Sequence, residues 1–344
     1  MNGAALNASY VLPLRRSGGE PPHEMTAYLA WLASLVDLVV VDGSPNPVFA
    51  AHARAWRGLP LRHVVPDAAI DVLNGKVAGV LTGIPLARFD RVIVADDDVR
   101  YDEPGLRRVV ALLDDADLVR PQNFFDPCPW HARWDTARTL LNRFAGGDYP
   151  GTLAVRRTVI PDGYDGDVLF ENLELIRTVR ARGGRVVTPL DCFVRRLPPT
   201  APHFWSQRVR QAYDDLAQPH RLVVSLLLWP LTISCLVRRK FGSVAAAAAG
   251  AAVIAELGRR RGGGRAVFPA SASAFAPLWL AERGLCSWLA VGNRLVRGGC
   301  PYGGTLIRRA ASSPRRLRLL QPGVAVGVTE ASGEVLDLVA GEGR

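Results

Sequence analysis

The stretch Arg91-Val92-Ile93-Val94-Ala95-Asp96-Asp97-Asp98 runs from four apolar residues directly into three carboxylates. A continuous apolar run of this kind is typical of a strand buried on both faces of a parallel sheet. Upstream, Leu38-Val39-Val40-Val41 ends in the same way at Asp42. Helix-like stretches alternate with such runs, so we predict an α/β fold with a mostly parallel sheet flanked by helices. We expect further strands at 9–14, 61–65 and 185–188, and helices at 26–36, 49–56, 76–83 and 167–182.

The acidic residues at the strand ends predict a binding site. In open parallel sheets ligands bind beyond the carboxyl ends of the strands, so Asp42 and the three adjacent aspartates should face one crevice. In an extended strand end, Asp96 and Asp98 point to one side and Asp97 to the other. Mg²⁺ or Mn²⁺ takes one or two such carboxylates and fills its other positions with phosphate and water oxygens. This pattern favours a metal that bridges the protein to a nucleotide diphosphate over a solvated acidic turn.

Several other classes of site are disfavoured. No GxGxxG follows the first strand and no GxxxxGK[ST] occurs, which argues against a dinucleotide Rossmann enzyme and a P-loop NTPase. The five cysteines are an odd number without a CxxC pair, so we expect neither a disulfide framework nor a zinc site. None of the six histidines has ligand spacing, and we assign none to a metal. The N-terminus lacks the pattern of a signal peptide, so we expect the first half of the chain in the cytoplasm.

Three stretches resemble, in order and spacing, the nucleotide-sugar half of the family 2 glycosyltransferases with the GT-A fold: VVVDGS (39–44), GKVA (75–78) and VADDDV (94–99). The likeness is greatest to the membrane-bound, ceramide-glucosyltransferase-like branch. It implies that Asp42 contacts the donor base, that Asp96 lies near the ribose, and that Asp98 together with Asp96 binds Mg²⁺ or Mn²⁺. Lys76 and Asp97 are expected at the donor as well.

The general base is expected in the stretch Phe170-Glu171-Asn172-Leu173-Glu174-Leu175, which resembles the family's Glu-Asp-x-x-Leu box. An inverting transfer needs a carboxylate to take the proton of the acceptor hydroxyl. Asn172 stands where the family has its basic aspartate, so we expect Glu171 to be the base. Glu174, one helical turn later, is the reserve candidate. Two ordinary glutamates in the first turn of a helix are the alternative.

A further box lies at Gln207-Arg208-Val209-Arg210, which resembles the Gln-x-x-Arg-Trp motif of processive and lipid-directed members. Gln207 and Arg210 match the motif, and an arginine there can pair with a diphosphate through two hydrogen bonds. Gln211 replaces the tryptophan, which argues against long-chain processivity. A solvent-facing helix residue is the alternative for Arg210.

The positive charge of the chain is concentrated in its C-terminal part. Residues 1–219 carry 25 basic and 26 acidic side chains, whereas residues 220–344 carry 17 basic and 6 acidic ones. Uncharged runs at 222–237 and near 244–255 end at arginine clusters, and each is shorter than the roughly 20 residues of a full span. We expect short spans, a shallow hairpin or interfacial helices. The arginines flank apolar runs instead of interleaving with aromatics, so we expect no nucleic-acid binding.

These features predict three regions. Residues 1–219 form the GT-A glycosyltransferase domain, 220–312 a membrane-associated helical region, and 313–344 a basic-to-acidic tail that is loosely ordered or a small hairpin. We predict an inverting, metal-dependent glycosyltransferase that moves sugar from a UDP- or GDP-linked donor to a lipid or lipid-linked hydroxyl. It would act at the cell membrane, with its catalytic domain in the cytoplasm.

Two alternatives stay open. A sugar nucleotidyltransferase also has an α/β sheet with metal-binding carboxylates, and Arg15-Arg16-Ser17-Gly18-Gly19 partly matches its glycine-rich loop. A catalytically impaired GT-A-like membrane protein that binds nucleotide sugar or a partner is supported by Asn172.

Overall fold

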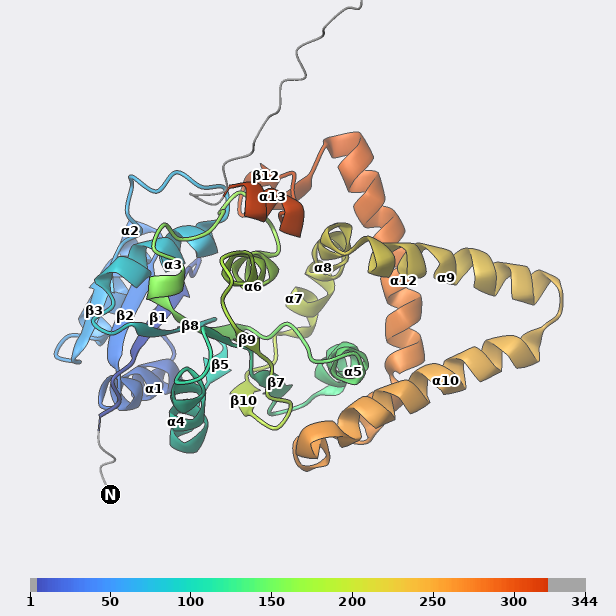
Figure 1. Cartoon of the computed structure of the whole chain (residues 1–344), viewed down its shortest axis with the longest axis horizontal. Helices are drawn as coiled ribbons and strands as arrows, with labels where there is room; N and C mark the ends of the chain where they lie inside the picture. Colours follow the sequence, from blue (N-terminus) through green and yellow to red (C-terminus); the bar gives the residue numbers. More distant parts are fainter. Residues whose placement is uncertain (1–4, 321–344) are drawn as a thin grey trace, which may run out of the picture.

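A seven-stranded sheet organises the first half of the chain in the computed structural model, which describes residues 5–320 (Figure 1). Its strand order is β3-β2-β1-β4-β8-β6-β9, and β8 alone among the seven runs antiparallel to its neighbours. The predicted mostly parallel sheet is therefore confirmed. The strands are β1 (Ser9–Leu14), β2 (Asp37–Asp42), β3 (Leu61–Val64), β4 (Arg91–Ala95), β6 (Leu118–Val119), β8 (Thr152–Arg156) and β9 (Val186–Val187).

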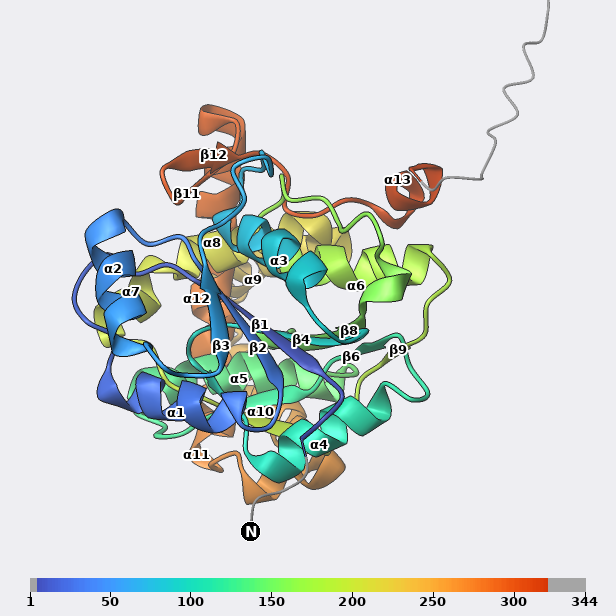
Figure 2. The ribbon, with the colours of Figure 1, turned by 90° about the vertical axis from the view of Figure 1, so that its left-hand side faces the viewer.

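Helices cover both faces of this sheet (Figure 2). Successive side chains of a strand point to opposite faces, so β1 contributes Tyr10 and Leu12 to one core and Val11 to the other. Helices α1 and α4 pack in the first core, and α3 and α6 pack in the second. The helices are α1 (His23–Ala33), α2 (Asn46–Ala55), α3 (Gly75–Leu86), α4 (Glu103–Leu112) and α6 (Glu171–Ala181).

A small second sheet lies at the carboxyl ends of the central strands. It consists of β5 (Val99–Arg100), β10 (Phe193–Arg196) and β7 (Gln122–Phe125), in the order β5-β10-β7. The antiparallel register pairs Arg196 with Val99, the residue that follows the three aspartates. This pairing brings a cation from a distant part of the chain to the acidic turn.

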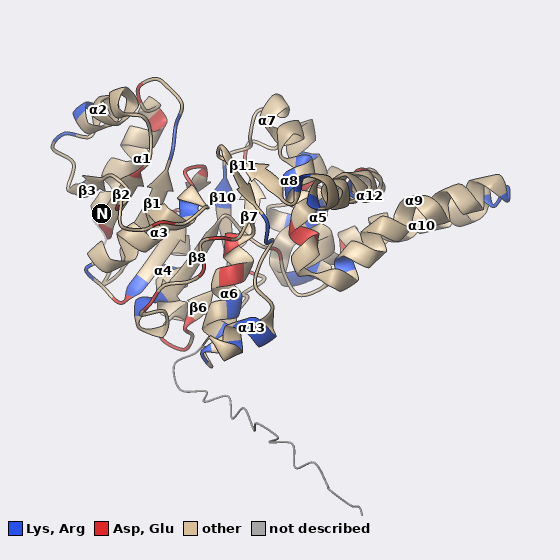
Figure 3. Cartoon of the chain, turned by 90° about the horizontal axis from the view of Figure 1, so that it is seen from above, with Lys and Arg blue, Asp and Glu red and all other residues tan. Residues whose placement is uncertain are grey.

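An arm of helices projects from the α/β domain (Figures 1 and 3). Helices α9 and α10 form its long hairpin, and the basic residues Arg238–Lys240 occupy the far end. By length and composition Pro219–Val237 and Phe241–Ala266 could each cross a membrane, with mean hydropathies of 1.7 and 1.6, and little of either is buried. The arm consists of α9 (Pro219–Val237), α10 (Phe241–Arg260), α11 (Ser271–Ala274) and α12 (Ala276–Gly292), with the short helical segments η3 (Arg261–Ala266) and η4 (Asn293–Arg297). Between the sheet and the arm lie α5 (Trp130–Phe144), α7 (Ala201–Ser206), α8 (Arg208–Tyr213) and η2 (Asp214–Ala217), whereas the single turn η1 (Arg157–Val159) follows β8.

Helix α12 anchors the arm to the α/β domain through two buried charges. Glu282 accepts from the guanidinium of Arg208 at 2.8 Å, and Arg283 pairs with Asp215 at 3.0 Å. Both charges lie within the apolar stretch 267–295 and pair with protein groups, so this face of α12 packs against α8 and η2.

Replacing Glu282 with alanine should lower the stability of the folded protein by about 3 kcal/mol. The buried guanidinium of Arg208 then keeps only part of the negative charge that balances it. Thermal unfolding in detergent measures this as a fall in Tm. Glu20→Ala, at an exposed position, is the matched control and should stay within about 0.5 kcal/mol of the parent. An unchanged Tm in Glu282→Ala would show that the arm is not held by this ion pair.

The chain returns from the arm to the α/β domain near its end. The hairpin of β11 (Cys300–Tyr302) and β12 (Thr305–Ile307) is followed by α13 (Pro314–Leu319). Between them, the backbone N–H of Phe170 donates to the carbonyl of Ala310 at 2.7 Å. The tail predicted at 313–344 thus begins with a short helix, and its residues 321–344 lie outside the described part of the chain.

Candidate active site

The three aspartates lie in the wall of a cavity of about 680 Å³ at the carboxyl ends of the strands. We call it the donor cavity. Strand β4 ends at Ala95, and Asp96, Asp97 and Asp98 form a turn in which the N–H of Val99 donates to the carbonyl of Asp96. All three side chains therefore line the same cavity. The expectation that Asp97 points away is wrong, because it assumed that the extended strand continues through these residues.

Cations neutralise the acidic turn. The ammonium of Lys76 forms an ion pair with Asp96, and the guanidinium of Arg196 lies 3.4 Å from Asp96 Oδ2 and 2.9 Å from Asp98 Oδ2. Despite burial, Lys76 and Arg196 hold the pKa of Asp96 below its usual value. Burial, reinforced by the charges of Asp96 and Asp97, raises the pKa of Asp98. Asp97 lies 3.5 Å from Arg16.

One carboxylate oxygen of Asp98 is free to bind a ligand. Its Oδ1 atom is buried and has no hydrogen-bond partner among the described residues. An unpaired carboxylate oxygen in such a position is costly unless something else binds it. Asp96 and Asp98 together therefore fit a hard divalent cation, whose preferred ligands are carboxylate and phosphate oxygens.

Asp42 is placed differently from the expectation. Its side chain is fully buried and does not line the donor cavity. The carboxylate accepts from Ser44 N at 2.9 Å and lies 2.6 Å from His52 Nδ1 and 3.0 Å from His63 Nε2. Despite burial, these hydrogen bonds, foremost that to His63, hold the pKa of Asp42 well below its usual range. In this structure Asp42 contacts His63 in place of the cavity, and the His63 ring stacks on Phe49 at 4.2 Å.

Asp42 and its two histidine partners form a group that could hold a metal ion. The ligand atoms of Asp42, His52 and His63 all lie within 4.8 Å of one another. Both histidine-to-carboxylate distances match hydrogen bonds, so the geometry is accounted for without an ion.

Glu171 stands at the N-terminus of α6 and faces the acidic turn. Its carboxylate lies 2.6 Å from the ammonium of Lys76, which therefore joins Asp96 and Glu171. Burial by itself lowers the pKa of the Lys76 ammonium. The two carboxylates have the larger combined effect and raise this pKa. The neighbouring Asn172 donates from its side chain to the carbonyl of Pro150 at 2.9 Å. That amide thus holds the loop before β8.

The reserve candidate Glu174 does not belong to the site. Its side chain is fully buried, lines neither of the two large cavities, and accepts from the backbone N–H of Ser312 at 2.6 Å. The physical reason is the returning C-terminal segment, which covers that face of α6. Burial raises the pKa of this carboxyl, and the residue holds the returning segment in place.

Gln207 and Arg210 come together as the sequence suggests. The Nε of Arg210 donates to Gln207 Oε1 at 2.5 Å, and both side chains line the donor cavity. The guanidinium of Arg210 also lies 5.4 Å from the ring centre of Tyr302. Gln211, which replaces the family tryptophan, accepts from Arg208 at 2.9 Å.

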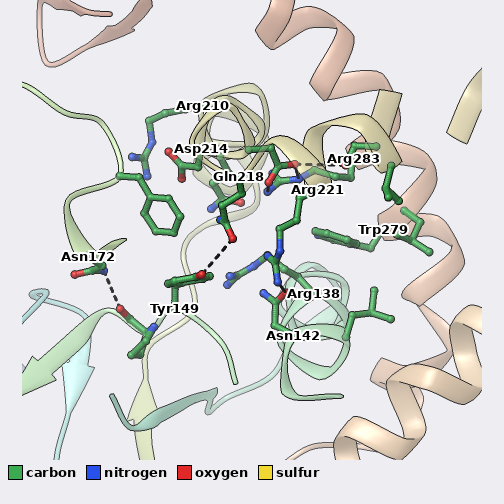
Figure 4. Close-up of a pocket in the computed structure, with 18 of the residues that line it drawn as sticks. Arg138, Asn142, Tyr149, Asn172, Arg210, Asp214, Gln218, Arg221, Trp279 and Arg283 are labelled. Atoms are coloured by element: carbon green, nitrogen blue, oxygen red, sulfur yellow. Dashed lines mark hydrogen bonds and ion pairs between the residues drawn. The ribbon is translucent and has the colours of Figure 1, made fainter. Parts of the chain in front are cut away.

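A second cavity of about 610 Å³ lies between the α/β domain and the arm (Figure 4). We call it the arm cavity. One end is polar and contains residues of the acidic turn and α8, whereas the other is formed by apolar residues of α9, α10 and α12. The apolar lining consists of Val224, Ala247, Gly250, Ala251, Ile254, Trp279 and Leu280. The two cavities meet, because five residues line both: Asp96, Glu171, Arg196, Arg210 and Gln211.

Sequence analysis missed three residues of these cavities. Arg196 reaches the acidic turn only through the register of β10, for which the local sequence gives no signal. Tyr302 lines the donor cavity from the hairpin at 300–307, a turn-rich segment for which no function was expected. Asp214 lines the arm cavity one helical turn after Arg210, and this spacing could have indicated it.

Comparisons with known proteins identify the fold. No protein-family model matches the chain, and no curated protein matches it. Among solved structures it is similar to the mannosyltransferase PcManGT from Pyrobaculum calidifontis in complex with GDP-Man and Mn²⁺, with 17% sequence identity and a TM-score of 0.52. That match covers 85% of this chain and 87% of the other. The chain has a GT-A-like fold.

Two further structures give weaker matches to this GT-A-like chain. S. aureus TarS 1-349 in complex with UDP-GlcNAc has 14% identity and a TM-score of 0.40, over 58% of this chain and 61% of the other. The glucosyl-3-phosphoglycerate synthase from Mycobacterium tuberculosis in complex with phosphoglyceric acid has 17% identity and a TM-score of 0.42, over 61% and 77%. The predicted fold class is confirmed, and the ceramide-glucosyltransferase-like branch stays a prediction.

Proposed function

We propose that the protein is an inverting, metal-dependent glycosyltransferase that moves sugar from a UDP- or GDP-linked donor to a lipid or lipid-linked hydroxyl at the cell membrane. The observation that carries this proposal is the junction of the two cavities at Asp96, Glu171, Arg196 and Arg210. A polar cavity suits a nucleotide sugar, and a cavity that becomes apolar toward two long exposed helices suits a lipid. The reaction would take place where the two meet.

On the donor side, Asp96 and Asp98 would hold Mg²⁺ or Mn²⁺, which when bound neutralises the charge of a departing diphosphate. Arg196 and Arg210 face the same place and can hydrogen-bond diphosphate oxygens through two N–H groups each. Lys76 adds a third cation. These groups favour the separated diphosphate more than the intact donor, which is the requirement for catalysis.

On the acceptor side, the hydroxyl must reach the anomeric carbon on the face opposite the diphosphate. Glu171 lines both cavities and is therefore placed to contact the acceptor hydroxyl and to keep Lys76 at the donor. Asp97, which pairs with Arg16, lines the donor cavity, and Asp42 holds His52 and His63. Gln207 fixes the orientation of Arg210.

The arm supports the proposed membrane association. Its hairpin exposes apolar side chains along its length, and arginine clusters lie at both ends, at 238–240 and 259–261. Basic residues beside an apolar surface attract anionic lipid headgroups. We propose that the catalytic domain lies on the cytoplasmic side, with the arm cavity open to lipid.

The test is transfer by the purified full chain in detergent. UDP-glucose, UDP-GlcNAc and GDP-mannose are screened with Mn²⁺ by thermal shift, and radiolabel from the donor that binds is followed into a bacterial lipid extract. We expect one donor to stabilise the protein and to label the lipid phase only when metal is present. If no donor gives a metal-dependent shift, the proposed function is wrong.

Glu171→Gln should reduce the transfer rate about tenfold, a loss of about 1.4 kcal/mol, because a neutral amide holds Lys76 and the acceptor hydroxyl less strongly than a carboxylate does. Donor binding with Mn²⁺ should persist, because Asp96 and Asp98 are untouched. Initial rates at saturating donor, together with the donor thermal shift, measure both effects. A variant with undiminished turnover would remove Glu171 from the catalytic set.

A further inference from the structure

The arm cavity contains one carboxyl group that the fold does not use. Four carboxylates line this cavity, and three of them are engaged: Asp96 and Glu171 with Lys76, and Asp215 with Arg283. The side chain of Asp214 makes no hydrogen bond or ion pair to any described residue, and its Oδ1 atom is buried without a partner. The contrast with the adjacent Asp215 is direct, since Asp215 also lies 3.4 Å from Ser225 Oγ.

The position of Asp214 is at the acceptor side of the junction. It begins η2, one helical turn after Arg210, and Figure 4 shows it beside Arg210 at the polar end of the arm cavity. It lines the arm cavity but not the donor cavity. A group in this position can reach an acceptor hydroxyl without competing for the metal.

The charges around Asp214 tune its proton affinity. Burial is the main cause that raises the pKa of Asp214, to about 7. Arg210 of α8 and Arg283 of α12 oppose this shift, whereas Glu171 of α6 and Asp215 of η2 reinforce it. His220 and Arg221 of α9 line the same cavity. A base is most effective when its proton affinity matches the working pH.

We propose that Asp214 is the general base of the transfer, an inference that rests on the proposed function. Asn172 stands at the family's base position and is committed to the carbonyl of Pro150. Glu171 is engaged by the ammonium of Lys76 at 2.6 Å. The Asp214 side chain has neither a hydrogen bond like that of Asn172 nor an ion pair like that of Glu171.

The transfer forms one bond to the anomeric carbon and breaks another. The acceptor oxygen forms a bond to the anomeric carbon, and its proton passes to the Asp214 carboxylate. The bond between the anomeric carbon and the diphosphate oxygen breaks, and the electron pair leaves with the diphosphate, which Arg196 and Arg210 face. Water in place of the lipid hydroxyl undergoes the same step and yields free sugar.

The experiment measures hydrolysis of the donor found to bind, by purified full chain with Mn²⁺, from pH 5 to 9. The wild-type rate should rise with pH through about 7, because the base must be ionised. Asp214→Asn should lower kcat by about 10²-fold or more and lose this rise, with the donor thermal shift retained. Asp214→Glu should recover part of the rate. Asp115→Asn, at an exposed position, is the matched control and should behave as wild type.

The possible outcomes separate the two proposals. If Asp214→Asn keeps the wild-type rate and pH profile, Asp214 is not the base. If the rise with pH disappears in Glu171→Gln and persists in Asp214→Asn, the base is Glu171. If wild type shows no metal-dependent donor shift, the proposed function itself fails, and with it the basis of the inference.

Discussion

Asp98→Asn should abolish the Mn²⁺-dependent stabilisation by the nucleotide-sugar donor and lower turnover by about 10³-fold. The variant removes one formal charge and one oxygen ligand while keeping the size of the side chain. A metal ion contributes several kcal/mol of charge stabilisation to such a reaction, and each 1.4 kcal/mol corresponds to a factor of about ten. Thermal shift with and without Mn²⁺, followed by initial rates, provides the measurement.

The same variant should fold normally in the absence of metal. Asp96, Asp97 and Asp98 repel one another, and Asp98 Oδ1 is buried without a partner. Removing one of these like charges therefore relieves a cost, which offsets the weakened contact with Arg196. Asp115→Asn again controls for the loss of an aspartate. A metal-dependent donor shift that survives in Asp98→Asn would show that the cation, if there is one, lies elsewhere.

The parts of the fold that the sequence predicts well are those set by local pattern. The apolar runs at 38–41 and 91–95 are strands of the sheet, and the helix expected at 76–83 lies within α3. In a chain where strands and helices alternate, a short apolar run is typical of a strand that is buried on both faces of the sheet. Placement of the acids at the carboxyl ends follows from the same topology.

The parts that could not be predicted depend on contacts between distant segments. Helical spacing suggests that Glu174 reaches the site, but its carboxylate accepts a hydrogen bond from a backbone N–H 138 residues away in the chain. Asp42 looks like a ligand contact, yet His52 and His63 enclose it. Arg196 joins the acidic turn only because β10 pairs with β5. In each case the contact that decides the residue's surroundings comes from a segment distant in the chain, which local sequence reasoning does not reach.

The apolar end of the arm cavity gives a way to separate donor chemistry from acceptor binding. Gly250 lines this end from α10, and a Cβ atom built there meets nothing within 4 Å. A larger side chain can therefore extend into the cavity without moving the backbone. Gly in the middle of a helix is also unfavourable, so the change should not destabilise the helix.

Gly250→Phe should therefore reduce sugar transfer to the lipid extract at least about tenfold, a loss of about 1.4 kcal/mol in acceptor binding. Donor binding and the slow hydrolysis of donor by water should stay within about twofold, a difference of about 0.4 kcal/mol, because the donor cavity lies on the other side of the junction. Gly242→Phe provides the control, since that glycine is also in α10 with open space around it, but lines neither cavity. Equal lipid transfer by the two variants would place the acceptor outside the arm cavity. Loss of hydrolysis together with transfer in Gly250→Phe would instead mean that the cavity supports the catalytic residues and does not hold the lipid.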